Sequence, residues 1–246
     1  MINRLITGFA AGTLLLTGVA HAEPVTGAPD LTANALYKAA KLPAVKCALA
    51  KGTSAASTKK YVTRLVGCLN KAWKPAIKGF QPVKVVFKKA DDKDSCSTGL
   101  TVSSSFAEIC ATEIHVRLAN DWIKPKSDLK VFTAVVRAWG GVVSGQSGIG
   151  EAWQALENDA SESLMNQQNR RYFLQQDCFM GVSAKALGRK VKDWKPTIRE
   201  KLFWEHFLKN KYAGKPANRL YWLQQGYKAG KPGACNTWKA ADSKVA

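Results

Sequence analysis

The chain has 246 residues, with 37 Lys and Arg against 18 Asp and Glu, which gives a formal charge of +19. Hydrophobic residues make up 46% and charged residues 22%, as in an ordinary globular chain. These proportions exclude a wholly disordered chain, a collagen-like repeat and a multispan membrane protein. The length is sufficient for a hydrophobic core in one large domain or two small ones.

Residues 1–22 have the pattern of a secretory signal peptide. Arg4 supplies the positive start, residues 5–20 are apolar and uncharged, and residues 20–22 form a small-x-small cleavage pattern. The apolar run is short for a membrane span, and no later segment is apolar enough for one. We therefore expect a mature chain that begins at Glu23, has no transmembrane segment, and is secreted or associated with the cell envelope.

The next predicted elements are mainly helical. Residues 23–30 contain Pro and Gly and are expected to be extended, and helical patterning begins near Leu31. The small polar residues of 52–57 predict a loop. Apolar residues at helical spacing predict a helix over 58–74, with Pro75 near its end.

Two strands are predicted in the middle of the chain. The β-branched run at 83–87 indicates the first, and the alternation of apolar and polar residues at 113–118 indicates the second, half-buried strand. In that alternation His115 falls on the polar face. The polar segment 91–105 between the two strands predicts a loop.

From residue 126 onward the pattern is helical. Apolar residues over 129–143 predict a long amphipathic helix with Ser127 or Asp128 as its N-cap, and the glycines of 145–150 end it. Further helices are predicted at 151–158, 161–187, 197–210 and 217–228. This order of elements predicts an α+β fold, mainly helical with a small sheet beside the helical body.

Six cysteines follow the predicted signal peptide: Cys47, Cys68, Cys96, Cys110, Cys178 and Cys235. An even number in an exported chain predicts three disulfides, which could be connected in about 15 ways. Nearest-neighbour pairing would join 47 to 68, 96 to 110 and 178 to 235, but loop entropy does not select it. The absence of any Cys-x-x-Cys pair argues against a zinc ribbon or a thioredoxin-type site.

Familiar catalytic motifs are scarce. His115 and His206 are the only histidines after the predicted signal peptide, and they cannot form a His-Glu-x-x-His zinc helix. We expect both to be structural, His115 as a solvated or hydrogen-bonded side chain. Ser147 lies in a run that resembles a nucleophile elbow, but Ile149 stands where that motif needs glycine. A helix-terminating loop is the favoured interpretation.

Acidic side chains offer a further candidate site. Paired carboxylates about 5–10 Å apart can hydrolyse glycosidic bonds. The sequence does not give that distance, and a solvated acidic face is the favoured interpretation. The candidates are Glu151, Glu157, Asp159, Glu162 and Asp177.

The segment 185–215 combines basic and aromatic residues. It carries ten Lys and Arg against three acidic residues, and the aromatic residues Trp194, Phe203, Trp204 and Phe207 lie among them. Such a mixture can bind polyanions, although aromatic residues at helical spacing more often belong to the core. The candidate polyanion-binding residues are Arg189, Lys190, Lys192, Lys195, Arg199, Lys201, Lys209 and Lys211.

Several stretches resemble the neutral zinc metallopeptidase family of secreted bacterial proteins. They are Asn-Arg-Leu-Tyr-Trp-Leu-Gln-Gln-Gly-Tyr at 218–227, Ala-Cys-Asn-Thr-Trp at 234–238, Leu-Gln-Gln-Asp-Cys-Phe-Met-Gly at 174–181, Cys-Leu-Asn-Lys-Ala-Trp-Lys-Pro at 68–75, and Cys110 with Ile-His-Val at 114–116. The resemblance covers roughly residues 31–240 and implies a zincin-like fold. It also supports the pairing of Cys178 with Cys235. It divides the chain into an N-terminal extension with a helix, 23–63, and a metallopeptidase-like domain, 64–246, in one compact unit.

The departures from the family fall on its zinc site. The His-Glu-x-x-His helix falls on Arg-Ala-Trp-Gly-Gly at 137–141, the third ligand on Phe173, and a family histidine on Ala213. A catalytic zinc needs about three protein ligands, and none is left. The resemblance thus implies zinc for the family, but we expect neither a cofactor nor a catalytic residue here. The vestigial positions are Arg137, Ala138, Gly141, Phe173 and Ala213.

Arg137 and Gly141 lie one helical turn apart. One hypothesis is that the guanidinium occupies the vacated cleft, with space beside Gly141, and makes it anion-binding. The alternative is that Arg137 faces water.

The sequence thus favours a secreted, non-catalytic pseudo-peptidase that binds an acidic envelope polymer or a protein or peptide partner. Nucleic acid ranks below these partners. The competing hypothesis is an active extracellular hydrolase, a peptidase or a glycan-cleaving enzyme, with an unrecognised site. Whether the chain is an enzyme is left open at this stage.

Overall fold

The structure is a computed structural model, and it describes residues 25, 28–89, 96, 104–156, 161–190, 194–199 and 212–246. The predicted signal peptide and most of the predicted helix at 197–210 lie outside the described residues. The long helices are α2 (Ala55–Trp73), α4 (Leu129–Gln146), α6 (Glu162–Ala186) and α8 (Pro216–Ala229). The short helices are α1 (Pro29–Thr32), α3 (Asn120–Ile123), α5 (Ile149–Gln154) and α7 (Lys195–Arg199). No helix in these ranges is long and apolar enough to cross a bilayer.

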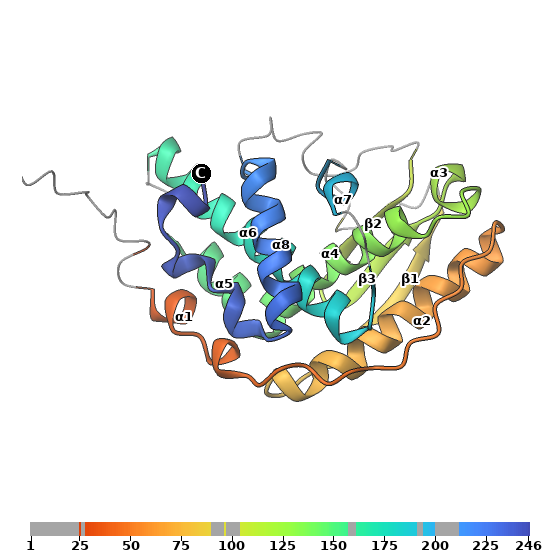
Figure 1. Cartoon of the computed structure of the whole chain (residues 1–246), viewed down its shortest axis with the longest axis horizontal. Helices are drawn as coiled ribbons and strands as arrows, with labels where there is room; N and C mark the ends of the chain where they lie inside the picture. The colour runs from red at the N-terminus through yellow and green to blue at the C-terminus, as the bar shows by residue number, and fades with distance from the viewer. Residues whose placement is uncertain are drawn as a thin grey trace, which may run out of the picture.

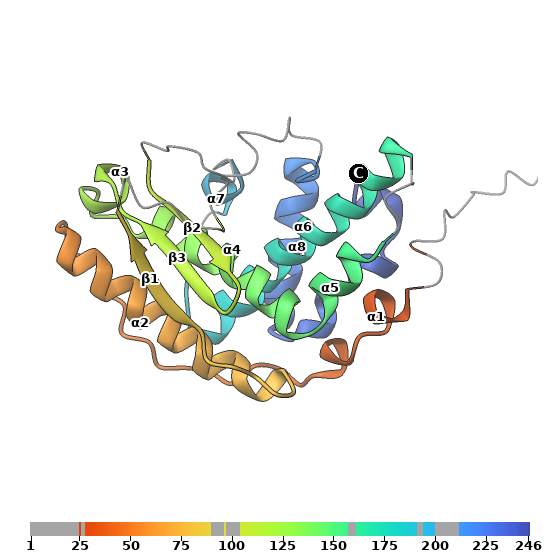
Figure 2. The same ribbon diagram turned by 180° about the vertical axis from the view of Figure 1, so that it is seen from behind.

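The sheet has three strands, β1 (Lys84–Lys88), β2 (Phe106–Cys110) and β3 (Glu113–Arg117), in the order β1-β3-β2. β1 runs parallel to β3, and β2 runs antiparallel to it. Figures 1 and 2 show α2 and α4 on the same side of the sheet. The side chains of Ile114 and Val116 on β3 are fully buried. The predicted α+β class, mainly helical with a small sheet, is confirmed.

The predicted strands at 83–87 and 113–118 correspond to β1 and β3, but β2 was not predicted from the sequence. It follows the predicted loop at 91–105, most of which lies outside the described residues. Its sequence, Phe-Ala-Glu-Ile-Cys, places a charged residue at the centre of a strand in which Glu108 is only 3% exposed. The missed strand completes the sheet against α4.

The N-terminal region is less helical than its sequence predicts. In place of a helix from residue 31 to 42, the structure has α1 and the 3-10 turn η1 (Ala35–Lys38). Residues 39–54, which we name the strap, then run without helix or strand along the outside of α2 (Figures 1 and 2). Leu31, Leu36 and Leu42 are all buried. Their spacing is therefore satisfied by separate contacts along the body and not by one helix face.

Helices α6 and α8 cross at two glycines. A Cβ atom added at Gly181 would lie 2.0 Å from the carbonyl oxygen of Leu223, and one at Gly226 would lie 2.0 Å from the carbonyl oxygen of Cys178. Each helix thus presents a glycine to the backbone of the other. Only residues without a side chain allow this approach.

Three disulfides are present: Cys47–Cys68, Cys96–Cys110 and Cys178–Cys235. The nearest-neighbour pairing is therefore correct for all six cysteines, including the pair that the family resemblance supports. The first bond fastens the strap to α2, the second joins Cys96 to β2, and the third joins α6 to the 3-10 turn η4 (Pro232–Cys235).

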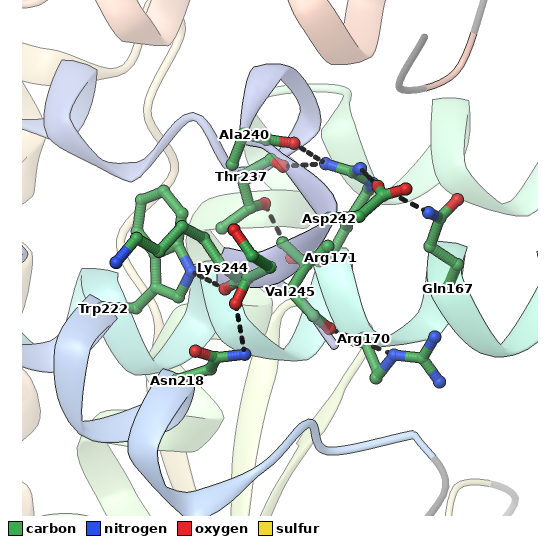
Figure 3. Close-up of polar contacts among 11 residues, drawn as sticks. Gln167, Arg170, Arg171, Asn218, Trp222, Thr237, Ala240, Asp242, Lys244 and Val245 are labelled. Atoms are coloured by element: carbon green, nitrogen blue, oxygen red, sulfur yellow. Dashed lines mark hydrogen bonds and ion pairs between the residues drawn. The ribbon is translucent and has the colours of Figure 1, made fainter. Parts of the chain in front are cut away.

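A buried arginine holds the C-terminal segment against α6 (Figure 3). Arg171 has no solvent exposure, and its Nη1 donates to the carbonyl oxygens of Thr237 and Ala240 at 2.6 and 2.8 Å. Its Nη2 lies 2.8 Å from the carboxylate of Asp242. On α8, Asn218 donates to the carbonyl oxygen of Ala246 at 2.7 Å. The end of the chain is thereby part of the folded body.

We expect Gly226→Ala to lower the free energy of unfolding by about 1–3 kcal/mol or more, because the new methyl group overlaps backbone that cannot move aside. The measurement is urea denaturation. Gly145→Ala is the matched control, since no described atom lies within 4 Å of a Cβ at that helical position. Its stability should be unchanged or slightly higher. Equal stabilities for the two variants would contradict the close crossing.

Candidate functional site

The centre of the vestigial positions holds a buried ion cluster. Arg137 on α4 and Arg219 on α8 both bind Asp177 on α6, with Nε to carboxylate oxygen distances of 3.1 and 2.9 Å. All three side chains are at most 6% exposed. Arg137 also donates from Nη2 to the carbonyl oxygen of Thr197 in α7, at 3.3 Å. One carboxylate therefore ties together three long helices, and α7 lies over the same guanidinium.

This geometry overturns the alternative in which Arg137 faces water, because the residue is buried and donates to Asp177 and to Thr197. A buried guanidinium with these partners also gives an external anion no exposed donor, which the anion-binding hypothesis requires. The space expected beside Gly141 is also filled: a Cβ there would lie 3.1 Å from the side chain of Ile109 on β2. At Gly140 a Cβ would lie 3.0 Å from Gln176 on α6. The two glycines let α4 approach both β2 and α6.

The other vestigial positions are packed as well. Phe173 is half-buried and makes edge contacts with the rings of Trp153 and Tyr172, with centroids 6.4 and 5.6 Å apart. Ala213 is 5% exposed, and Ala138 is half-buried. Hydrophobic and small side chains thus stand where the resemblance would place metal ligands.

The remaining catalytic candidates have structural partners. His115 is 6% exposed, so its placement on a polar, outer face is wrong, but the expected hydrogen bond is present: its Nε2 lies 3.1 Å from the carboxylate of Glu113. Ser147 caps the C-terminus of α4 and donates to the carbonyl oxygen of Ser144 at 3.2 Å. The helix-terminating interpretation of that glycine-rich run is therefore correct. His206 lies outside the described residues.

Among the acidic candidates, Glu162 and Asp177 do not form a catalytic pair. Glu162 and Asp177 stand at opposite parts of α6, about 22 Å apart along the axis, which exceeds the separation that glycoside hydrolysis needs. Glu151 is exposed, while Asp177 is bound by two arginines. Glu157 and Asp159 lie outside the described residues. In the part of the chain that the structure describes, no three His, Cys, Asp or Glu side chains are placed to hold a metal ion.

The predicted basic segment is only partly described. Lys192, Lys201, Lys209 and Lys211 lie outside the described residues, as does the side chain of Arg199. Lys190 and Lys195 are exposed.

Arg189 has an internal role. It binds both carboxylate oxygens of Asp128, at 2.5 and 2.6 Å, and lies 4.5 Å from the ring centroid of Phe132. Tyr61 on α2 donates to the same carboxylate at 2.7 Å. This cluster joins α2, the start of α4 and the end of α6.

A different part of the chain carries a long run of positive charge without acidic residues. Residues 31–89 contain thirteen Lys and Arg and no Asp or Glu. Eleven of the thirteen are exposed, and we name them the cationic flank: Lys38, Lys41, Lys46, Lys59, Lys60, Arg64, Lys71, Lys74, Lys78, Lys84 and Lys89. The strap, α2 and β1 that carry most of them run along one side of the molecule (Figures 1 and 2).

A groove lies on the outer face of α2 within this flank. It has a volume of about 440 Å³ and is lined by Lys60, Thr63, Arg64, Gly67, Cys68 and Lys71, which we name the α2 groove. These residues follow the i, i+3, i+4, i+7 spacing of one helix face. The Nη1 of Arg64 donates to the carbonyl oxygen of Ala48 in the strap at 2.9 Å.

Sequence reasoning missed this region because it searched for dense clusters of basic and aromatic residues. The cationic flank is less dense than the segment 185–215. The signal that could have found it is visible in the sequence: no acidic residue occurs over the 59 positions from 31 to 89. The alignment of charges along α2 follows from helical spacing, and every residue that lines the α2 groove belongs to that helix.

Comparisons with protein-family models, with curated proteins and with solved structures found no match to this chain.

We expect Asp177→Asn to lower the free energy of unfolding by about 3–5 kcal/mol, because it leaves two buried guanidinium groups without their shared counter-charge. The measurement is urea denaturation at pH 7. Glu151→Gln removes an exposed carboxylate and is the control, with an expected change below about 0.5 kcal/mol. If Asp177→Asn unfolded at the same urea concentration as wild type, the ion cluster would not be what holds the helices together.

The Asp128 cluster predicts a pH dependence. Burial alone raises the pKa of Asp128, but hydrogen bonds from Arg189 and Tyr61 and the charge of Arg189 outweigh it, so its pKa is lowered in the folded protein. A lowered folded pKa stabilises the protein above the unfolded pKa, and this contribution is lost as the pH falls through the folded pKa. The difference in unfolding free energy between wild type and Asp128→Asn should therefore be largest near pH 7 and shrink toward pH 3. A difference that is constant with pH would contradict this assignment.

Proposed function

We propose that this protein is a non-catalytic binding protein for anionic polymers of the cell envelope, exported to an oxidising compartment. The observation that carries the proposal is the cationic flank, eleven exposed Lys and Arg side chains within a segment of 59 residues that contains no acidic residue. Three disulfides are typical of exported proteins.

The positive side chains of the cationic flank act together on a charged partner. Like charges on one side of a protein create a field that raises the local concentration of oppositely charged partners and accelerates their association. Such a field costs stability through self-repulsion, so its concentration in one flank needs a reason beyond solubility. An anionic polymer offers many charges in a row and is the partner that such a flank fits best.

The interior of the molecule supports a non-catalytic role. If the resemblance to the zinc metallopeptidases reflects common descent, the ligand positions have been replaced by an ion cluster, close helix contacts and packed aromatic rings. Arg137, Gly141 and Phe173 each have partners inside the body. The protein would then be a pseudo-peptidase that has kept the scaffold without the metal chemistry.

We expect the mature protein to bind poly(glycerol phosphate), a polyanionic probe, with an affinity that falls as salt rises. Three neutralised phosphates at about −0.7 each give a slope near −2 in log Kd⁻¹ against log salt, or roughly a 20-fold loss between 50 and 200 mM. The measurement is fluorescence anisotropy across that range. Zinc or a chelator should leave the affinity unchanged.

Two other results would indicate a different function. Salt-insensitive binding of unstructured peptides, without polyanion binding, would favour a peptide-binding pseudo-enzyme. Turnover of peptide or glycan substrates by the purified protein would favour a hydrolase. Either result would overturn the polyanion proposal.

A further inference from the structure

We propose that the α2 groove binds the backbone of a phosphodiester polymer and that Gly67 keeps the floor of the groove clear for it. This inference rests on the proposed function and adds the position of the site and the class of ligand. It is carried by three observations: a glycine that packing does not require, a lining that contains neither a carboxylate nor an aromatic ring, and the placement of Arg64.

Gly67 is out of place in the interior of a long helix. Glycine there is less favourable than alanine by the largest margin of any residue except proline. At Gly181 and Gly226 packing accounts for the glycine, because a Cβ atom would lie 2.0 Å from a backbone oxygen of the other helix. At Gly67 no described atom lies within 4 Å of an added Cβ. That Cβ would lie in the space that the groove encloses.

The lining of the groove suits an anionic backbone. Two ammonium groups, one guanidinium and the hydroxyl of Thr63 supply donors, and the lining contains neither a carboxylate nor an aromatic ring. Reading bases or sugar rings generally uses aromatic stacking, which these residues do not offer. The groove would therefore recognise the repeated charges of the polymer backbone and not the bases or sugar rings attached to that backbone.

The spacing of the cations fits a polymer with regularly spaced charges. Lys60 and Arg64 are one turn apart, about 6 Å along the helix, and Lys71 lies about 10 Å farther along the same face. A single small anion would not reach all three. A chain that lies along α2 can place successive anionic groups against each of them.

Arg64 distinguishes phosphate from a generic counter-ion. It is the only arginine among the thirteen basic residues of 31–89. One side of its guanidinium is held by the carbonyl oxygen of Ala48, and the disulfide Cys47–Cys68 fixes that part of the strap to α2. Because the guanidinium of Arg64 is planar and already held on one side, it loses less conformational entropy on binding a phosphate than a free lysine side chain does. Tetrahedral phosphate oxygens can accept from Arg64 and from Lys60 and Thr63 at different angles, whereas a carboxylate accepts best in its plane.

The first test separates stability from binding at Gly67. Gly67→Ala should raise the melting temperature by about 2–4 °C and weaken binding of poly(glycerol phosphate), and Gly67→Leu should weaken it at least fivefold. Ala56→Leu, at an exposed position on the first turn of α2 outside the groove, is the matched control and should bind as wild type. Wild-type affinity in Gly67→Leu would overturn the role of Gly67.

The second test separates the groove from the rest of the cationic flank. Replacing Lys60, Arg64 and Lys71 by alanine should reduce the salt slope by about 2. Replacing the exposed Lys38, Lys78 and Lys84 by alanine removes the same charge and should leave most of the slope intact. Equal losses in both variants would place binding on the whole flank and overturn the groove, while the proposed function would stand. No binding by wild type would overturn the proposed function itself.

The ligand class is tested with three polymers of similar length. Poly(glycerol phosphate) and a thymidylate oligomer both carry phosphodiesters and distinguish an envelope polymer from a polynucleotide, and hyaluronate carries carboxylates. Tighter binding of either phosphodiester polymer than of hyaluronate, with the difference lost in Arg64→Lys, is the expected result. Equal or tighter binding of hyaluronate would overturn the phosphodiester assignment.

Discussion

The structure depends on a single turn of α6, in which three different links coincide. Asp177 binds arginines from α4 and α8, Cys178 is bonded to Cys235 near the C-terminus, and Gly181 lets the backbone of α8 approach. These constraints are mutually dependent, because the two guanidinium groups reach one carboxylate only if the helices lie close together. Gly226 on α8 supplies the reciprocal contact. The close crossing therefore sets where the buried charges lie, and the charges in turn fix α4 and α7.

The same turn brings separate helices together at one point. One carboxylate and two guanidinium groups join α4, α6 and α8 by directional hydrogen bonds, and Arg137 extends the link to α7. A metal ion can hold side chains from separate elements in the same mechanical way. The ion cluster does so while its members are buried, without an opening to solvent.

Much of the fold could be predicted from local patterns, and the failures have physical causes. Helix α2 follows from apolar periodicity because it buries one face over several turns. Helices α4 and α6 follow from their length and apolar content, since α4 and the second half of α6 are buried on nearly every side. β2 was missed because the charged residue Glu108 stands at its centre, and its burial depends on the pairing of β2 with β3. The helix expected at 31–42 failed because its leucines contact separate elements. Among site residues, the partners of Arg137 could not be predicted, since nothing local links α4 to an aspartate 40 positions away.

The cationic flank shows how the molecule separates charge that holds the fold from charge that faces outward. The buried arginines each have an acidic partner, and Arg171, Arg189 and Arg219 join helices to other parts of the chain. The strap is joined to α2 by the disulfide Cys47–Cys68, and two of its amides, those of Leu42 and Val45, donate to the carbonyl oxygens of Gly230 and Ala186 elsewhere in the body. A cross-link that closes a loop of this size contributes about 3 kcal/mol, which offsets repulsion between two positive segments. Acidic residues in the flank would have provided the same attraction and would have cancelled the outward field. Under the proposed function, their absence leaves that field intact for an anionic partner.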